Sequence, residues 1–179
     1  MKVLAENYTP QSVFRENRKQ AAKIWGAVLL VAFLWLAFIA GAPLFKSAGF
    51  EDFAGAVYRF FSYVCHQISE RSFHAGEHPF AVCSRCFGFY GGFFLGLAGY
   101  PLFRALDDTE SFPRVWLFLA MIPMGIDWSL GFFGIWENTL WSRSLTGAIL
   151  GAACAFFIVP ALAEISRWFV DRKVKRLSR

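Results

Sequence analysis

The stretch that decides the fold is Ile24–Phe45, IWGAVLLVAFLWLAFIAGAPLF, which runs for 22 residues without a charged side chain. A helix of that length rises about 33 Å, enough to cross the ~30 Å hydrocarbon core of a bilayer. The whole chain has the same character, because 56% of its 179 residues are hydrophobic and only 17% are charged. Soluble domains carry charge on about a quarter of their residues. The sequence therefore predicts an integral membrane protein.

Three further runs have the length and composition of spanning helices. Residues 86–103 and 144–163 are free of charge, and residues 115–136 carry one charged side chain, that of Asp127. Together with the first run they predict an all-α membrane bundle of four transmembrane helices. A fifth apolar stretch, residues 53–64, has a helical stripe but is too short to span, which predicts an interfacial or re-entrant helix.

The positive charges indicate the orientation of this bundle. Thirteen of the 18 Lys and Arg residues lie in residues 1–23, in residues 165–179 or in the loop after the second predicted span. The positive-inside rule places these segments in the cytoplasm and residues 65–86 on the periplasmic or extracellular side of the plasma (inner) membrane. The single transmembrane domain is then residues 24–164. A signal peptide cleaved near Ala40–Ala42 is the alternative for the first run.

The basic tails suit a membrane surface better than a nucleic acid. Nucleic-acid binding requires a basic face with interleaved aromatic residues on a soluble element, which the tails do not provide. The positive charges are explained as topology signals that also contact anionic lipid. The expected partner is therefore the lipid bilayer, and no nucleic-acid partner is expected.

Reactive side chains are concentrated in residues 65–86, which contain all three histidines and three of the four cysteines. Cys83 and Cys86 form a Cys-x-x-Cys step at the expected start of a helix, where the helix dipole favours thiolates. With Cys65 they supply three sulfur ligands, and one more ligand would complete a tetrahedral Zn or Fe site. The candidates for the fourth ligand are His66, His74, His78 and Asp127. The sequence thus predicts a metal site on Cys65, Cys83 and Cys86, with His66 beside them.

The same cysteines are compatible with two other functions. On the oxidising side of a membrane, Cys83 and Cys86 are also able to act as a dithiol–disulfide couple, as in a thiol–disulfide or quinone-linked oxidoreductase. Alternatively, the three sulfurs are a structural staple in a non-catalytic scaffold, transporter or complex subunit. All three functions remain open at the level of the sequence.

Asp127 is expected at the same end of the bundle, in the outer half of its span. A carboxylate within a span costs about 2.5–3.5 kcal/mol unless it is paired, so one interpretation is an ion pair with Arg85 or Arg143. The other makes Asp127 and His66 the acid–base residues of a metal-dependent enzyme. Its substrate would be an anionic or phosphorylated molecule at the lipid side. The residues expected to bind this substrate are Arg71, Arg85, Asn138 and Arg143.

Small residues recur with helical spacing in two of the predicted spans. Gly88, Gly92 and Gly96 fall on one face of the second span, and Gly147 and Gly151 fall on one face of the fourth. Such stripes allow two membrane helices to approach closely. Close contact would bring the polar residues at the outer ends of these two spans together.

Several short motifs follow one another in a fixed order: Cys65-His66-Gln67, Glu70-Arg71-Ser72-Phe73, Cys83-Ser84-Arg85-Cys86 with Gly88 and Tyr90, then Ile126-Asp127, Asn138, Arg143 and Thr146-Gly147. This combination resembles the signature of a prokaryotic integral-membrane family known only as domain of unknown function 2085. The resemblance covers about residues 58–151. It implies a shared membrane fold and a shared polar cluster on the outer face, and it brings no established reaction.

Overall fold

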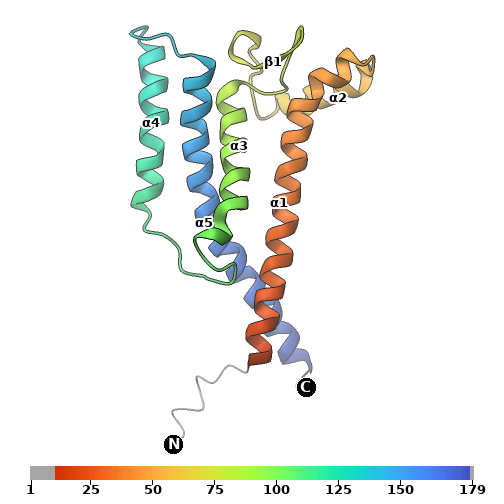
Figure 1. Cartoon of the computed structure of the whole chain (residues 1–179), viewed down its shortest axis with the longest axis vertical. Helices are drawn as coiled ribbons and strands as arrows, with labels where there is room; N and C mark the ends of the chain where they lie inside the picture. The colour runs from red at the N-terminus through yellow and green to blue at the C-terminus, as the bar shows by residue number, and fades with distance from the viewer. Residues whose placement is uncertain (1–10, 178–179) are drawn as a thin grey trace, which may run out of the picture.

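The computed structural model describes residues 11–177, which form five α-helices and one small hairpin (Figure 1). Two-residue strands pair in the antiparallel hairpin, so the predicted all-α class holds apart from this element. The elements in chain order are α1 (Gln11–Ser47), α2 (Glu51–Ser62), the 3-10 turn η1 (Ser69–Arg71), β1 (His74–Ala75), β2 (His78–Pro79), α3 (Ser84–Gly99), the 3-10 turn η2 (Tyr100–Leu102), α4 (Val115–Phe132) and α5 (Leu140–Leu177).

Three helices contain apolar segments long enough to cross a membrane, namely Phe14–Ser47 in α1, Val115–Phe132 in α4 and Leu140–Val170 in α5. The remaining predicted span, residues 86–103, is divided between α3 and η2. Helix α3 has 16 residues and rises about 24 Å, less than the ~30 Å hydrocarbon core. Helix length and composition thus support three of the four predicted spans.

The four long helices lie side by side (Figure 1). Helices α1 and α4 run in one direction and α3 and α5 in the other, so α1 begins and α5 ends at the same end of the bundle. The opposite end carries α2, the β1–β2 hairpin and the α4–α5 loop, and we call it the hairpin end. Helices α1 and α5 extend into the predicted tails, and the remaining tail residues, 1–10 and 178–179, lie outside the described residues.

Helices α3 and α5 form the most extensive helix pair, and their glycines allow the close approach that the sequence predicts. A Cβ atom at Gly92 would lie 2.1 Å from the carbonyl oxygen of Ala148. From the other helix, a Cβ atom at Gly151 would lie 2.0 Å from the carbonyl oxygen of Phe89. The two backbones are therefore in direct contact, and this contact holds the N-terminal ends of α3 and α5 side by side.

The predicted short helix is present as α2. Gly49, with φ of +86°, ends α1 in the left-handed conformation that glycine adopts readily, and the chain then turns into α2. The predicted apolar stripe is only partly buried, because Val57 and Phe61 are buried whereas Phe53 and Phe60 are exposed. Helix α2 packs against α1, and the two exposed rings lie at the edge of this contact, Phe53 against Phe45 and Phe60 against Trp35.

Candidate functional site

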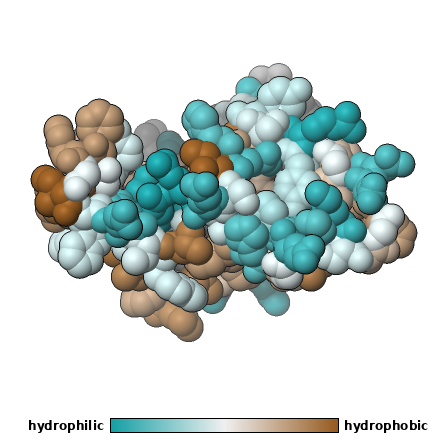
Figure 2. Space-filling view, turned by 90° about the horizontal axis from the view of Figure 1, so that it is seen from above, coloured by the Kyte–Doolittle hydropathy of each residue, from teal (hydrophilic) through white to brown (hydrophobic). Residues whose placement is uncertain are grey.

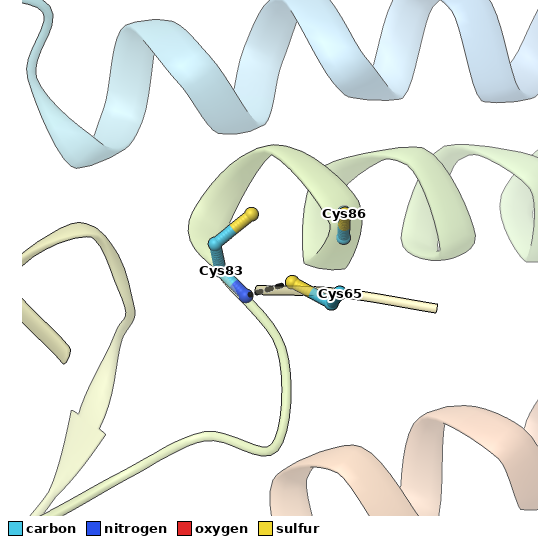
Figure 3. Close-up of side chains that lie close together, drawn as sticks. All are labelled: Cys65, Cys83 and Cys86. Carbon is cyan, nitrogen blue, oxygen red and sulfur yellow. Dashed lines mark hydrogen bonds between the residues drawn. The ribbon is translucent and has the colours of Figure 1, made fainter. Parts of the chain in front are cut away.

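Three cysteines meet at the hairpin end (Figure 3). The Sγ atoms of Cys65, Cys83 and Cys86 all lie within 4.8 Å of one another. Cys65 follows α2, Cys83 is the N-cap residue of α3, and Cys86 lies in the first turn of that helix. None of the three is in a disulfide. The predicted convergence of three sulfurs is confirmed.

Helix α1 positions the segment that leads to Cys83. Pro43 has no N–H group, so the carbonyl of Ile39, four residues earlier, has no partner within the helix. The backbone N–H of Ala81 donates to this carbonyl at 3.2 Å. A proline in a spanning helix thus provides the acceptor that holds the start of α3 against α1.

Gln67 joins the two segments that carry the cysteines. Its side-chain amide donates to the carbonyl oxygens of Tyr58 and Ala81, both at 2.8 Å. Gln67 has φ of +51°, a conformation that residues other than glycine adopt only where other contacts hold them. These bonds keep Cys65 beside Cys83. Gln67 was not among the predicted site residues, although its place within Cys65-His66-Gln67 was a signal for this role.

The environment of Cys65 stabilises a thiolate. Cys65 is 6% exposed and belongs to an apolar core that includes Ile39 and Phe61. Hydrogen bonds from the thiols of Cys83 and Cys86 lower the pKa of Cys65 well below its usual range, and the backbone N–H of Cys83 donates to its Sγ at 3.2 Å. The thiolate is the form of cysteine that binds metals and attacks electrophiles.

The predicted fourth ligands lie apart from this cluster. Within residues 11–177, the group of close ligand atoms consists of the three cysteine sulfurs without a histidine or carboxylate. The His66 side chain is exposed. The ring of His74 hydrogen-bonds to the carbonyl of Ser72 at 3.0 Å and to the hydroxyl of Ser69 at 3.1 Å, and His78 is half-buried in the hairpin. The fourth ligand therefore stays a prediction.

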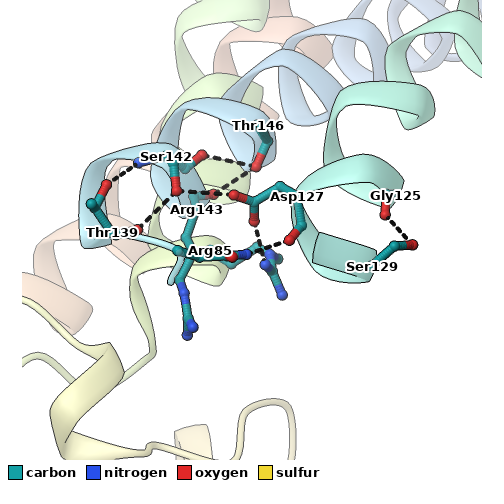
Figure 4. Close-up of polar contacts among 9 residues, drawn as sticks. Arg85, Gly125, Asp127, Ser129, Thr139, Ser142, Arg143 and Thr146 are labelled. Carbon is teal, nitrogen blue, oxygen red and sulfur yellow. Dashed lines mark hydrogen bonds and ion pairs between the residues drawn. The ribbon is translucent and has the colours of Figure 1, made fainter. Parts of the chain in front are cut away.

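A second polar cluster lies where α3, α4 and α5 meet (Figure 4). Asp127, 9% exposed, accepts hydrogen bonds from Arg85 Nη2 at 2.5 Å and from Ser142 Oγ at 2.9 Å. The Asn138 amide donates to the backbone carbonyl of Asp127. Arg85 is thus the partner that the sequence argument required for this carboxylate. Ser142 was missed, although it stands between two residues that were singled out, Asn138 and Arg143.

Arg143 lies beside this pair and has no acidic partner within 4.0 Å in the described part of the chain. The charged groups that act on it through space are Arg71, Arg85 and Asp127. The Nε atoms of Arg85 and Arg143 are both buried without a hydrogen-bond partner, whereas Arg71 is exposed. Hydrophilic side chains extend over much of the hairpin end (Figure 2). The carboxylate of Asp127 thus pairs with Arg85 alone, and the guanidinium of Arg143 stays without an acidic partner in the described residues.

Known proteins are similar to this chain over most of its described length. A family described as "Predicted membrane protein (DUF2085)" matches residues 65–157. The uncharacterised protein MJ1492 of Methanocaldococcus jannaschii is 35% identical over 144 residues, which cover 77% of this chain and 92% of that protein. An uncharacterised protein of Methanothermobacter thermautotrophicus is 35% identical over 97 residues, covering 53% of this chain and 84% of that protein. No solved structure is significantly similar. The chain therefore belongs to the DUF2085 family of predicted membrane proteins.

Proposed function

We propose that this protein is a membrane metalloprotein in which Cys65, Cys83 and Cys86 bind one Zn or Fe ion. The observation that carries the proposal is the convergence of three disulfide-free sulfurs within 4.8 Å of one another. Around tetrahedral Zn, with Zn–S bonds of about 2.3 Å, the sulfurs lie about 3.8 Å apart. The separations between sulfurs need to shorten by about 1 Å at most.

Three protein ligands leave a fourth position, which in catalytic zinc sites is taken by water or substrate. A metal ion with such an open coordination position would act as a Lewis acid and would lower the pKa of a bound water molecule. We infer that His66, exposed and next to Cys65, is the fourth ligand or a proton-transfer group. Asp127 is the second proposed acid–base residue, and its hydrogen bonds with Arg85 and Ser142 fix its orientation.

We further infer that α3 is the fourth membrane span and that the hairpin end is periplasmic or extracellular. Helix α3 packs along α5, itself long enough to span, and η2 continues α3 as far as Leu102. Helix α1 begins and α5 ends at the same end of the bundle, and this arrangement requires an even number of spans between them. The basic residues in these terminal helices favour the cytoplasm for that end. Phe53 and Phe60, exposed on α2, suit the headgroup region.

Metal analysis of the detergent-purified chain tests the metal site. We expect about one ion per chain in the natural protein and less than about one tenth in Cys83→Ser, because two sulfurs bind zinc far more weakly than three. Cys154→Ser is the matched control, since this half-buried cysteine of α5 lies outside the cluster. Less than about one tenth of an ion in the natural protein after zinc loading would contradict the proposal, as would equal loss in both folded variants.

Thiol–disulfide chemistry is the second candidate, and the closeness of the Cys83 and Cys86 sulfurs favours it. Forming a disulfide between them releases two electrons and two protons, which a membrane quinone accepts as it becomes a quinol. Thiol titration distinguishes the two functions. Three thiols that react only after a chelator is added indicate the metal site, whereas two thiols that oxidise reversibly in ion-free protein indicate the redox couple.

A further inference from the structure

Positive charge is concentrated where the N-terminal ends of α3 and α5 meet. The two helices run in the same direction (Figure 1), and the glycine contact holds them together. Each helix N-terminus is equivalent to about half a positive elementary charge, so two such ends face one region. Arg85 is the second residue of α3 and Arg143 the fourth residue of α5. Two full charges thus add to the two dipoles.

Among the described residues, a carboxylate pairs with only one of these two arginines. Asp127 pairs with Arg85, and Arg143 has no acidic partner in the described residues. The other carboxylates of the hairpin end are exposed and form no ion pair with an arginine in the described residues, namely Glu51, Asp52, Glu70, Glu77 and Glu137.

The arginine side chains also keep unused hydrogen-bond donors. The Nε atoms of Arg85 and Arg143 are buried without an acceptor. A partly buried donor or charge without a partner costs free energy. An anion with several acceptor oxygens that bridges the two guanidinium groups would satisfy both the charge and the donors.

We propose that Arg85, Arg143 and Arg71 form a binding site for a phosphate group. Phosphate carries up to two negative charges and offers paired oxygens that match the planar guanidinium fork. The site lies at the end of the spanning segments of α4 and α5, which is the depth of lipid headgroups in a bilayer. The ligand is the phosphate of an anionic lipid or inorganic phosphate, and the site does not depend on the metal.

Titration calorimetry of the detergent-purified protein tests this site with three probes. Inorganic phosphate represents the free anion, dihexanoyl phosphatidic acid represents a lipid headgroup, and dihexanoylglycerol provides the same chains without phosphate. We expect saturable binding of one or both phosphate probes and none of dihexanoylglycerol. Tighter binding of phosphatidic acid identifies the lipid as the source of the phosphate, and equal binding shows that the phosphate group alone is recognised.

Variants connect this binding to the arginines. Arg143→Gln should raise the dissociation constant about ten-fold or more, the effect of losing a charge-assisted bidentate contact. Arg59→Gln, which removes an exposed charge from α2 at the same end, should change it less than about two-fold. If Arg143→Gln does not fold, Arg143→Lys keeps the charge without the fork and should still weaken binding several-fold. No saturable phosphate binding, or equal losses in the Arg143 and Arg59 variants, would overturn the proposal.

Discussion

Replacing Gly92 by alanine should force α3 and α5 apart. The added Cβ would lie 2.1 Å from the carbonyl oxygen of Ala148, whereas ordinary contacts of a Cβ begin at 3.4 Å. The obstructing atom is backbone, so no change of rotamer relieves the clash, and the helices must separate locally by about 1.3 Å. Overpacking typically costs about 1–3 kcal/mol, and we expect a loss of about 2–3 kcal/mol in the free energy of unfolding.

Gly91→Ala is the matched control for this change. A Cβ at Gly91 has no neighbour within 4 Å, and alanine favours a helix over glycine by up to about 1 kcal/mol. Thermal unfolding in detergent, followed by circular dichroism, should give a Tm lower by about 5–10 °C for Gly92→Ala and unchanged or higher for Gly91→Ala. Equal Tm values for the two variants would refute the argument that backbone contact holds α3 to α5.

Two further predictions concern the polar contacts. Gln67→Ala removes both 2.8 Å hydrogen bonds that hold the cysteine segments together. Zinc affinity, measured against a competing chromogenic chelator, should therefore fall at least about ten-fold. Unchanged affinity would show that the sulfurs need no such support. Asp127→Asn leaves Arg85 without its carboxylate and should lower unfolding free energy by about 3 kcal/mol. Ser142→Ala removes only one hydrogen bond and should cost about 1 kcal/mol, so equal losses would contradict the central role of the ion pair.

Charge-free runs and small-residue spacing predicted the parts of the fold that depend on local sequence. The long apolar helices α1, α4 and α5 follow from the absence of charges over about 20 residues, because the bilayer sets the required length. The contact between α3 and α5 follows from glycines at every fourth position, which leave room for a second backbone. The closeness of Cys83 and Cys86 at the start of α3 also follows, since the two residues are one helical turn apart.

Features that depend on contacts between distant segments were not predictable in this way. Apolar composition does not reveal that α3 ends at Gly99 and that Tyr100–Leu102 forms a 3-10 turn. The bond from Ala81 to the free carbonyl of Ile39 joins residues far apart in the chain. Hydropathy also does not predict which side chains lie outside the cysteine cluster. His66, next to Cys65 in the chain, is exposed and lies outside it.

The isolation of Asp127 has a consequence for how the chain is made. It is the only buried residue of α4, so α4 without its neighbours would expose one acid in an otherwise apolar helix, which costs about 2.5–3.5 kcal/mol on entering a bilayer. Arg85 is synthesised earlier, but Ser142, 15 residues after Asp127, emerges from the ribosome only with the start of α5. Arg85 neutralises the charge of the acid, whereas the second hydrogen bond to its carboxylate needs α5, so the partners of Asp127 are complete only when α4 and α5 lie together.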